Sequence, residues 1–141
     1  MMLIAFDLDG TLVDSVGDLA AALDAYLAGA GYGTAGVELV QRIMGAGAHD
    51  LIALSLAEQG GVLPDPEIDF HAKRFLRGYQ EHDHVRSSLY PGARMVLADL
   101  KAAGAALAVV TNTPIASSRA LRESVPLSYL SPIAGFAGRL S

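Results

Sequence analysis

The sequence predicts an α/β fold in which parallel strands carry an inserted helical module. Two short apolar runs, residues 2–6 and 105–110, each stop abruptly at polar residues, as buried parallel strands do. About a hundred residues separate the two runs, far more than the dozen or so that a crossover connection needs. The simplest architecture is a core in two pieces, residues 1–14 and 88–141, with a helical module over residues 15–87.

Five helices are expected, because apolar residues recur at spacings of three and four. Ser15 and Asp18 form a candidate capping box for the first helix, and Gly104 stands where the last helix would end. The expected ranges, in chain order, are 16–30, 37–44, 51–58, 68–79 and 95–103.

Composition limits the classes of protein that this chain can belong to. Of its 141 residues, 52% are hydrophobic and only 18% are charged, which disfavours intrinsic disorder. The chain has no cysteine, so disulfides, cysteine-based zinc sites and thiol nucleophiles are excluded.

Charge is distributed unevenly along the chain. Residues 1–70 carry 11 acidic side chains and one Arg, while residues 71–141 carry nine basic and four acidic ones. The acidic first half would repel a polyphosphate backbone, so no nucleic-acid partner is expected. Neither a secretory signal nor a membrane helix is evident, and a soluble cytoplasmic protein is expected.

Asp7 and Asp9 are the first candidates for chemistry. They lie two residues apart after the first expected strand, where both carboxylates could face one pocket, and Gly10 permits a sharp turn beside them. One carboxylate could attack phosphorus while the other, protonated, donates to the leaving oxygen. The alternative is an Asx-type turn in which the acids only cap loop amides.

Residues 6–15, FDLDGTLVDS, resemble the first signature motif of the haloacid dehalogenase superfamily, in its phosphatase branch. The resemblance implies that Asp7 is the nucleophile and Asp9 the general acid/base. It also implies a Mg²⁺ site that includes Asp7 and Asp9, and a phosphate site that includes Leu8 and Asp9. The acid at position 9 is similar to that of the hydrolase and mutase members.

A second motif lies at the end of the second expected strand. Residues 107–112, LAVVTN, resemble the family's hydrophobic strand that ends in a phosphate-binding Thr or Ser, which implies that Thr111 and Asn112 hold the phosphoryl group. Residues 89–92, LYPG, and the helix after them resemble the corresponding segment of phosphoglycolate phosphatases. These resemblances together imply an α/β fold with an incomplete Rossmann-like core and an inserted helical cap.

The loop at residues 44–48, MGAGA, resembles the cap loop that closes over the substrate in phosphoglycolate phosphatase-like members. That resemblance implies substrate contacts by Gly45, Ala46 and Gly47. The alternative is a plain turn between two helices.

Two further parts of the family's site are not evident downstream of Thr111. The family uses a Lys and an acidic motif there, whereas the cations in this stretch are Arg119, Arg122 and Arg139 and the one acid is Glu123. Residues 131–135 resemble the start of the next strand. The chain is therefore expected to be truncated just before the Lys.

Histidines offer rival sites. Residues 81–84, EHDH, contain metal-ligand types, but their alternation near a helix end favours a solvated surface. His49 and His71 have no evident partners in the sequence and are expected at the surface or in packing contacts.

The expected function is a magnesium-dependent phosphatase that hydrolyses a small phosphorylated metabolite similar to phosphoglycolate through an aspartyl-phosphate. One alternative is a phosphosugar mutase of the same fold. Another is a non-catalytic remnant that lacks the downstream Lys and acidic motif. Neither the exact substrate nor the oligomeric state follows from the sequence.

Overall fold

The computed structural model describes residues 2–112 and the backbone of the short strand at residues 133–135. The chain divides into two compact units. The first comprises Met1–Ser15 and His84–Ser141, and the second comprises Val16–Asp83. None of the described helices is long and apolar enough to cross a membrane.

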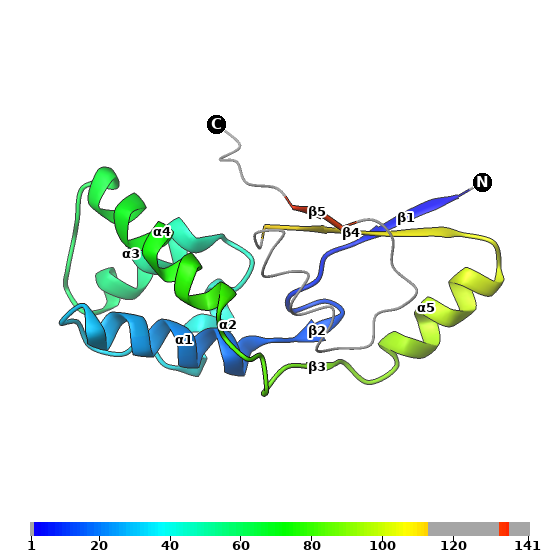
Figure 1. Ribbon diagram of the computed structural model, residues 1–141, viewed down its shortest axis with the longest axis horizontal. Helices are drawn as coiled ribbons and strands as arrows, with labels where there is room; N and C mark the ends of the chain where they lie inside the picture. The colour runs from blue at the N-terminus through cyan, green and yellow to red at the C-terminus, as the bar shows by residue number, and fades with distance from the viewer. Residues whose placement is uncertain (1, 113–132, 136–141) are drawn as a thin grey trace. The chain divides into compact units, whose positions relative to one another are not determined.

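The first unit is built on a parallel sheet in the order β1-β4-β5 (Figure 1). Its strands are β1 (Leu3–Phe6), β4 (Ala106–Thr111) and β5 (Ile133–Gly135). In the register of β1 and β4, Leu3 lies opposite Ala106 and Phe6 opposite Val109. The predicted α/β class with parallel strands is confirmed.

A small antiparallel ladder completes the strands of this unit. It pairs β2 (Val13–Asp14) with β3 (Ser88–Leu89). The amide of Tyr90 also donates to the carbonyl of Leu12 at 3.0 Å. The ladder therefore ties the segment after β1 to the segment that enters α5.

Helix α5 (Ala93–Ala102) leads into β4 and ends one residue before the predicted end at Ala103. Gly104 has φ +84°, a conformation that side chains with a Cβ disfavour. The amide of Gly104 donates to the carbonyl of Lys101, and the amide of Ala105 donates to the carbonyl of Leu100, each at 3.0 Å. This is the hydrogen-bond pattern of a Schellman C-cap. The core of the unit consists of Leu8, Leu12, Val13, Leu97, Ala105, Leu107 and Val109.

The second unit is helical. Its elements are α1 (Val16–Gly29), α2 (Val37–Ile43), α3 (Ala48–Glu58) and α4 (Asp65–Gln80). Helix α4 packs against both α1 and α3. The apolar residues that predicted these helices face one core, in which Leu23, Ile52 and Phe75 are at most 2% exposed.

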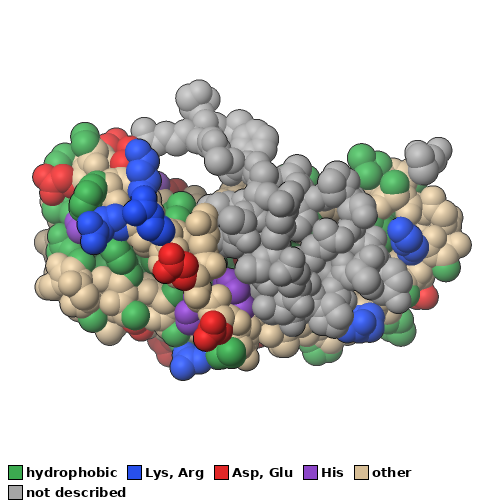
Figure 2. Space-filling view, viewed as in Figure 1, with side chains coloured by type: hydrophobic (Ala, Val, Ile, Leu, Met, Phe, Trp, Pro, Cys, Tyr) green, Lys and Arg blue, Asp and Glu red, His purple; other side chains and the backbone are tan. Residues whose placement is uncertain are grey.

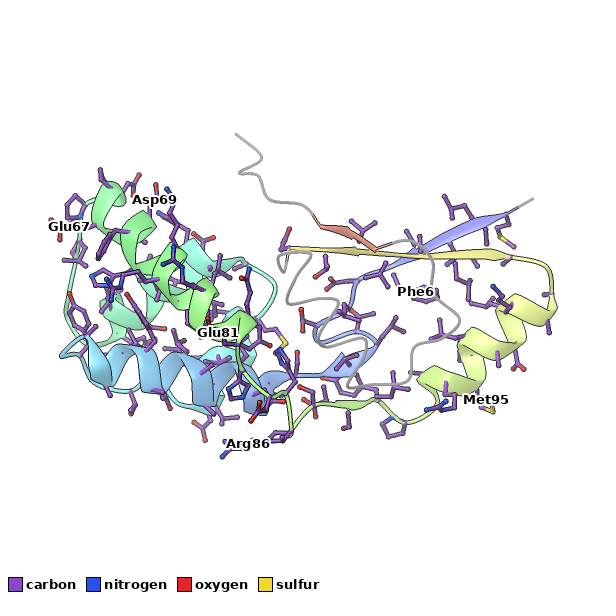
Figure 3. All side chains as sticks on the ribbon, in the orientation of Figure 1. Phe6, Glu67, Asp69, Glu81, Arg86 and Met95 are labelled. Atoms are coloured by element: carbon purple, nitrogen blue, oxygen red, sulfur yellow. The ribbon has the colours of Figure 1, made fainter. Side chains whose placement is uncertain are left out.

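Charge is segregated along α4. Its second half carries exposed Lys73, Arg74 and Arg77, and Figure 2 shows Lys and Arg side chains gathered on this unit. Figure 3 shows Glu67 and Asp69 near the start of the helix and Glu81 beyond its end. Acids at the N-terminus and cations toward the C-terminus suit the helix dipole.

Candidate active site

Two candidate residues lie at the carboxyl ends of neighbouring strands of the parallel sheet. Asp7 directly follows β1, and Thr111 is the last residue of β4. Because β1 and β4 are neighbouring parallel strands, their carboxyl ends lie at the same edge. Residues that the sequence separates by a hundred positions thus come from adjacent strand ends, where ligands bind in open α/β sheets.

The loop after β1 is closed by its own backbone. The carbonyl of Leu8 accepts hydrogen bonds from the amides of Leu12 and Val13, each at 3.0 Å, and Gly10 donates to the carbonyl of Val13 at 2.9 Å. Gly10 has φ +79°, which allows this tight turn. The side chain of Leu8 is 1% exposed and anchors the loop in the core.

Asp9 is held by Ser15. The hydroxyl of Ser15 donates to Oδ1 of Asp9 at 2.6 Å, the short distance expected of a bond to a carboxylate. Ser15 is fully buried and Asp9 is half-buried. Sequence reasoning assigned Ser15 to a helix cap and missed this contact, although the position of Ser15 within the same motif was a signal for it.

The carboxyl group of Asp7 is electrostatically unfavourable when ionised. Partial burial is the main cause that raises its pKa above the ordinary value of 3.8, and the charge of Asp9 raises it further. A hydrogen bond from the backbone amide of Leu8 acts in the opposite direction. The side chain still reaches solvent, so the group is open to a ligand that brings positive charge.

Thr111 and Asn112 differ in exposure. Thr111 is 3% exposed and Asn112 is exposed. Beyond them, the expectations for Arg119, Arg122, Glu123 and Arg139 fall outside the described residues.

The predicted cap loop lies in the second unit, between α2 and α3. Gly45 and Gly47 have φ +93° and +92°, and a Cβ at either would meet no atom within 4 Å. The loop is therefore constrained by its backbone and not by crowding. The amide of Leu51 donates to the carbonyl of Gly47 at 3.0 Å, where α3 begins.

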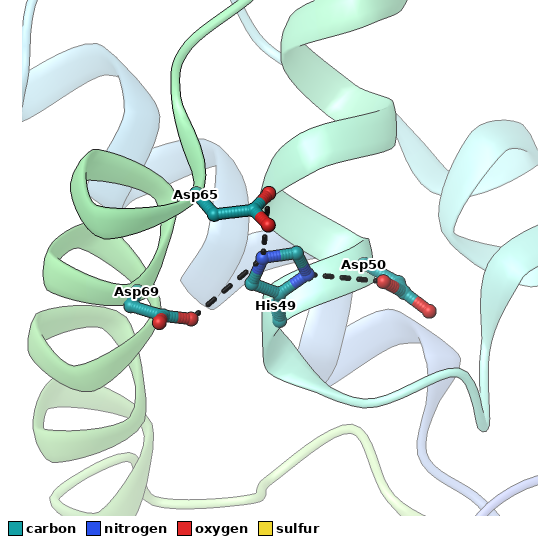
Figure 4. A network of polar contacts seen from close by, with 4 residues as sticks. All are labelled: His49, Asp50, Asp65 and Asp69. Carbon is teal, nitrogen blue, oxygen red and sulfur yellow. Dashed lines mark hydrogen bonds and ion pairs between the residues drawn. The ribbon is translucent and has the colours of Figure 1, made fainter. Parts of the chain in front are cut away.

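His49 follows this loop and contacts three carboxylates (Figure 4). Its Nδ1 lies 3.1 Å from Asp50, and its Nε2 lies 3.7 Å from both Asp65 and Asp69. These contacts join the start of α3 to the start of α4. Among the described residues, no three His, Asp or Glu side chains are grouped so that they could hold a metal ion.

The stretch at residues 81–84 differs from the solvated surface that was expected. His84 is 2% exposed, so that interpretation is wrong for this residue. His82 is partly buried, and its Nε2 lies 3.0 Å from a carboxylate oxygen of the fully buried Asp18. The alternation of polar residues gave no sign of these long-range partners.

Curated relatives share most of this chain. A phosphoglycolate phosphatase of Vibrio cholerae is 43% identical over 115 residues, which cover 79% of this chain and 51% of the relative. One of Pseudomonas fluorescens Pf-5 is 44% identical over 115 residues, which cover 79% of this chain and 42% of the relative. The chain thus spans about half the length of the curated relatives it matches.

Solved structures agree with the fold. A predicted phosphoglycolate phosphatase from Haemophilus somnus 129PT has a TM-score of 0.81 at 29% identity, covering 100% of this chain and 65% of that one. CbbY from Rhodobacter sphaeroides in complex with phosphate has a TM-score of 0.70 at 26% identity, covering 100% and 66%. Residues 4–130 match the haloacid dehalogenase-like hydrolase family. The chain therefore belongs to the haloacid dehalogenase-like hydrolases.

Proposed function

We propose that this chain carries the nucleophile and phosphoryl-binding groups of a phosphatase that acts on small phosphomonoesters of the phosphoglycolate type. The observation that carries the proposal is the pairing of β1 with β4, which brings the segment of Asp7 and Asp9 to the strand end that carries Thr111. The names of the relatives at 43% and 44% identity support the substrate class.

In the proposed reaction, a carboxylate oxygen of Asp7 forms a bond to phosphorus and the ester P–O bond breaks. The leaving oxygen takes a proton from the carboxyl group of Asp9. Water then attacks the aspartyl-phosphate and gives a proton to Asp9, so that inorganic phosphate leaves and Asp7 is restored. Ser15 donates to Oδ1 of Asp9, so the proton in this scheme would be carried by Oδ2.

Thr111, Asn112 and the backbone amides of Leu8 and Asp9 would hold the phosphoryl oxygens. The Leu8 amide already acts on the Asp7 carboxyl group, where it partly offsets the rise in pKa that burial causes. The same amide is therefore close to the proposed nucleophile.

The residues present suit a magnesium ion. Mg²⁺ is usually held by one or two carboxylates, substrate phosphate and water, and Asp7 and Asp9 supply two carboxylates on one short loop. Burial, and to a smaller extent the charge of Asp9, raise the pKa of Asp7, and a nearby cation would favour its ionised form. A phosphate that approaches these carboxylates is repelled by them: two like charges 4 Å apart repel by roughly 4 kcal/mol at an effective dielectric of 20. When bound, Mg²⁺ would neutralise part of the charge that repels the phosphate.

The second unit, with its loop at Gly45, Ala46 and Gly47, is proposed as the cap that selects the substrate. Gly45 and Gly47 both have a positive φ, and a Cβ at either would meet no atom within 4 Å, so the loop has open space beside its backbone. The cap assignment is supported by the helical character of Val16–Asp83 as a separate compact unit.

Release of phosphate from 2-phosphoglycolate and from a phosphomonoester panel, with Mg²⁺ present, tests the proposal. We expect hydrolysis by the native chain and none by Asp7→Asn. The matched control is Asp99→Asn, which changes an exposed carboxylate of α5 in the same unit. Equal activity in Asp7→Asn and the native chain would refute the nucleophile, and transfer of phosphate to a second hydroxyl without release would indicate a mutase.

Binding can be tested separately from turnover. Titration of inorganic phosphate with Mg²⁺, followed by amide chemical shifts, should perturb residues 8–10 and Thr111. A chain that neither hydrolyses the panel nor shows these perturbations would be a non-catalytic remnant, which contradicts the proposal.

A further inference from the structure

A pocket of about 450 Å³ lies between α1 and α4 in the second unit. Helix α4 supplies Phe70, His71 and Arg74 to its lining. The opposite wall has Tyr26 and three residues with little or no side chain, Ala25, Gly29 and Ala30. The small residues open space beside a group of aromatic and basic side chains.

The aromatic side chains of the pocket contact one another. The hydroxyl of Tyr26 lies 2.7 Å from Nδ1 of His71. Tyr26, Tyr32 and Phe70 each meet the His71 ring edge to face, with centroids 5.6–6.0 Å apart. Phe70 is nevertheless 56% exposed. An apolar ring this accessible can gain burial from a ligand.

Arg74 supplies the charge of the pocket. Its guanidinium carbon lies 5.4 Å from the centroid of Phe70, within the range of a cation–π contact. Its charge acts on Tyr26, where it partly offsets the rise in pKa that burial causes. The guanidinium is thus directed toward the pocket and not away along the surface.

No carboxylate balances this charge within the described part of the chain. None of the lining residues is acidic, and none of the ion pairs between described residues includes Arg74. Lys73 and Arg77 flank it on α4. Glu67 and Asp69 lie near the start of the helix, and Glu81 lies beyond its end (Figure 3). The pocket is therefore locally positive in a chain whose net charge is −5.

We propose that this pocket binds a small aromatic anion, whose charged group meets Arg74 and whose ring packs against Phe70 and the small residues of α1. The charge of Arg74 selects an anion, and the exposed ring with the open wall opposite selects a flat apolar body. This site lies wholly within the second unit. It does not depend on the proposed phosphatase activity.

Benzoate is the probe for the test, followed by amide chemical shifts of the whole chain. We expect shifts centred on Tyr26, His71 and Arg74, with a dissociation constant of about 10 mM for a ligand of this size. Benzyl alcohol, which lacks the charge, and inorganic phosphate, which lacks the ring, should each bind more weakly at these residues. Equal binding of either control, or benzoate shifts confined to other residues, would overturn the proposal.

Arg74→Gln should weaken benzoate binding roughly five-fold, the loss expected for one exposed charge contact of about 1 kcal/mol. Arg77→Gln is the matched control, because Arg77 is exposed on the same helix and does not line the pocket. Unchanged affinity in Arg74→Gln overturns the proposal. Should that variant lose its native spectrum, binding to the unmodified chain in 0.5 M salt decides: weakening supports the charge contact, and constancy overturns it.

Discussion

Replacing Ser15 with Ala removes the hydroxyl that holds Asp9. The two oxygens lie 2.6 Å apart and Ser15 is fully buried. A hydrogen bond to a charged group contributes about 1.5–3 kcal/mol to stability. Because Asp9 is half-buried, water can replace part of the lost bond, so we expect a loss near the lower end, about 1.5 kcal/mol in the free energy of unfolding.

A double-mutant cycle in urea isolates this contact. It compares the native chain, Ser15→Ala, Asp9→Ala and the double variant, and we expect a coupling energy of about 1 kcal/mol between the two sites. Ser88→Ala is the matched control, because Ser88 is exposed in the same unit. That change should alter stability by less than about 0.5 kcal/mol.

The same variants also show whether Ser15 orients Asp9 for catalysis or only stabilises the fold. If Ser15 orients Asp9 for proton transfer, Ser15→Ala should lower kcat and leave KM for the phosphomonoester unchanged, while Ser15→Thr, which keeps a hydroxyl, should recover most of kcat. A coupling energy near zero together with an unchanged kcat would refute the reasoning. In that case the 2.6 Å contact would be incidental to both stability and chemistry.

Three further perturbations test other parts of the structure. In metal-free buffer, Asp7→Asn should stabilise the fold at pH 7, because the raised pKa of Asp7 means that folding disfavours the charged carboxylate. Thermal melts should show that this gain in stability vanishes as the pH falls below 3.8, where the carboxyl group is protonated in both states. A gain that stays constant with pH would contradict the raised pKa. Leu23→Ala removes a side chain that is 0% exposed and should cost 2–5 kcal/mol in urea unfolding, against less than about 1 kcal/mol for Leu54→Ala, which is 43% exposed. Gly104→Ala should lower the free energy of unfolding by about 1–2 kcal/mol, because φ at this residue is +84°. Gly78→Ala, inside α4, should raise it by up to about 1 kcal/mol. Changes of the same sign in the two variants would contradict a backbone origin of these effects.

The sequence predicted the regular elements well because their signals are local. Apolar spacing located all five described helices, and α2 and α5 end within one residue of the expected limits. Gly104 is an example of a stop signal that works on its own, since a Schellman cap requires only the glycine and the carbonyls of the preceding turn. The two long apolar strands were equally clear, because both are bounded by polar residues.

Features that depend on distant partners could not be predicted in this way. The strands β2 and β3 are two residues long, too short to show alternation, and exist because their partners are brought together. His71 had no evident partner in the sequence and His82 was expected on a solvated surface, yet they contact Tyr26 and Asp18, which are 45 and 64 residues away in sequence. Such contacts follow from the packing of α1 against α4, which periodicity alone does not specify.

The candidate site combines both kinds of feature. Asp9 and Ser15 lie in one short segment, whose loop is closed by bonds to the carbonyl of Leu8, so their contact is local in sequence. The same loop is anchored by Leu8 in a core that includes Leu107 and Val109 of β4. Thr111 comes to the same end of the sheet through the pairing of Phe6 with Val109. A variant that weakens β4 should therefore impair phosphate binding more strongly than it weakens the bond between Ser15 and Asp9.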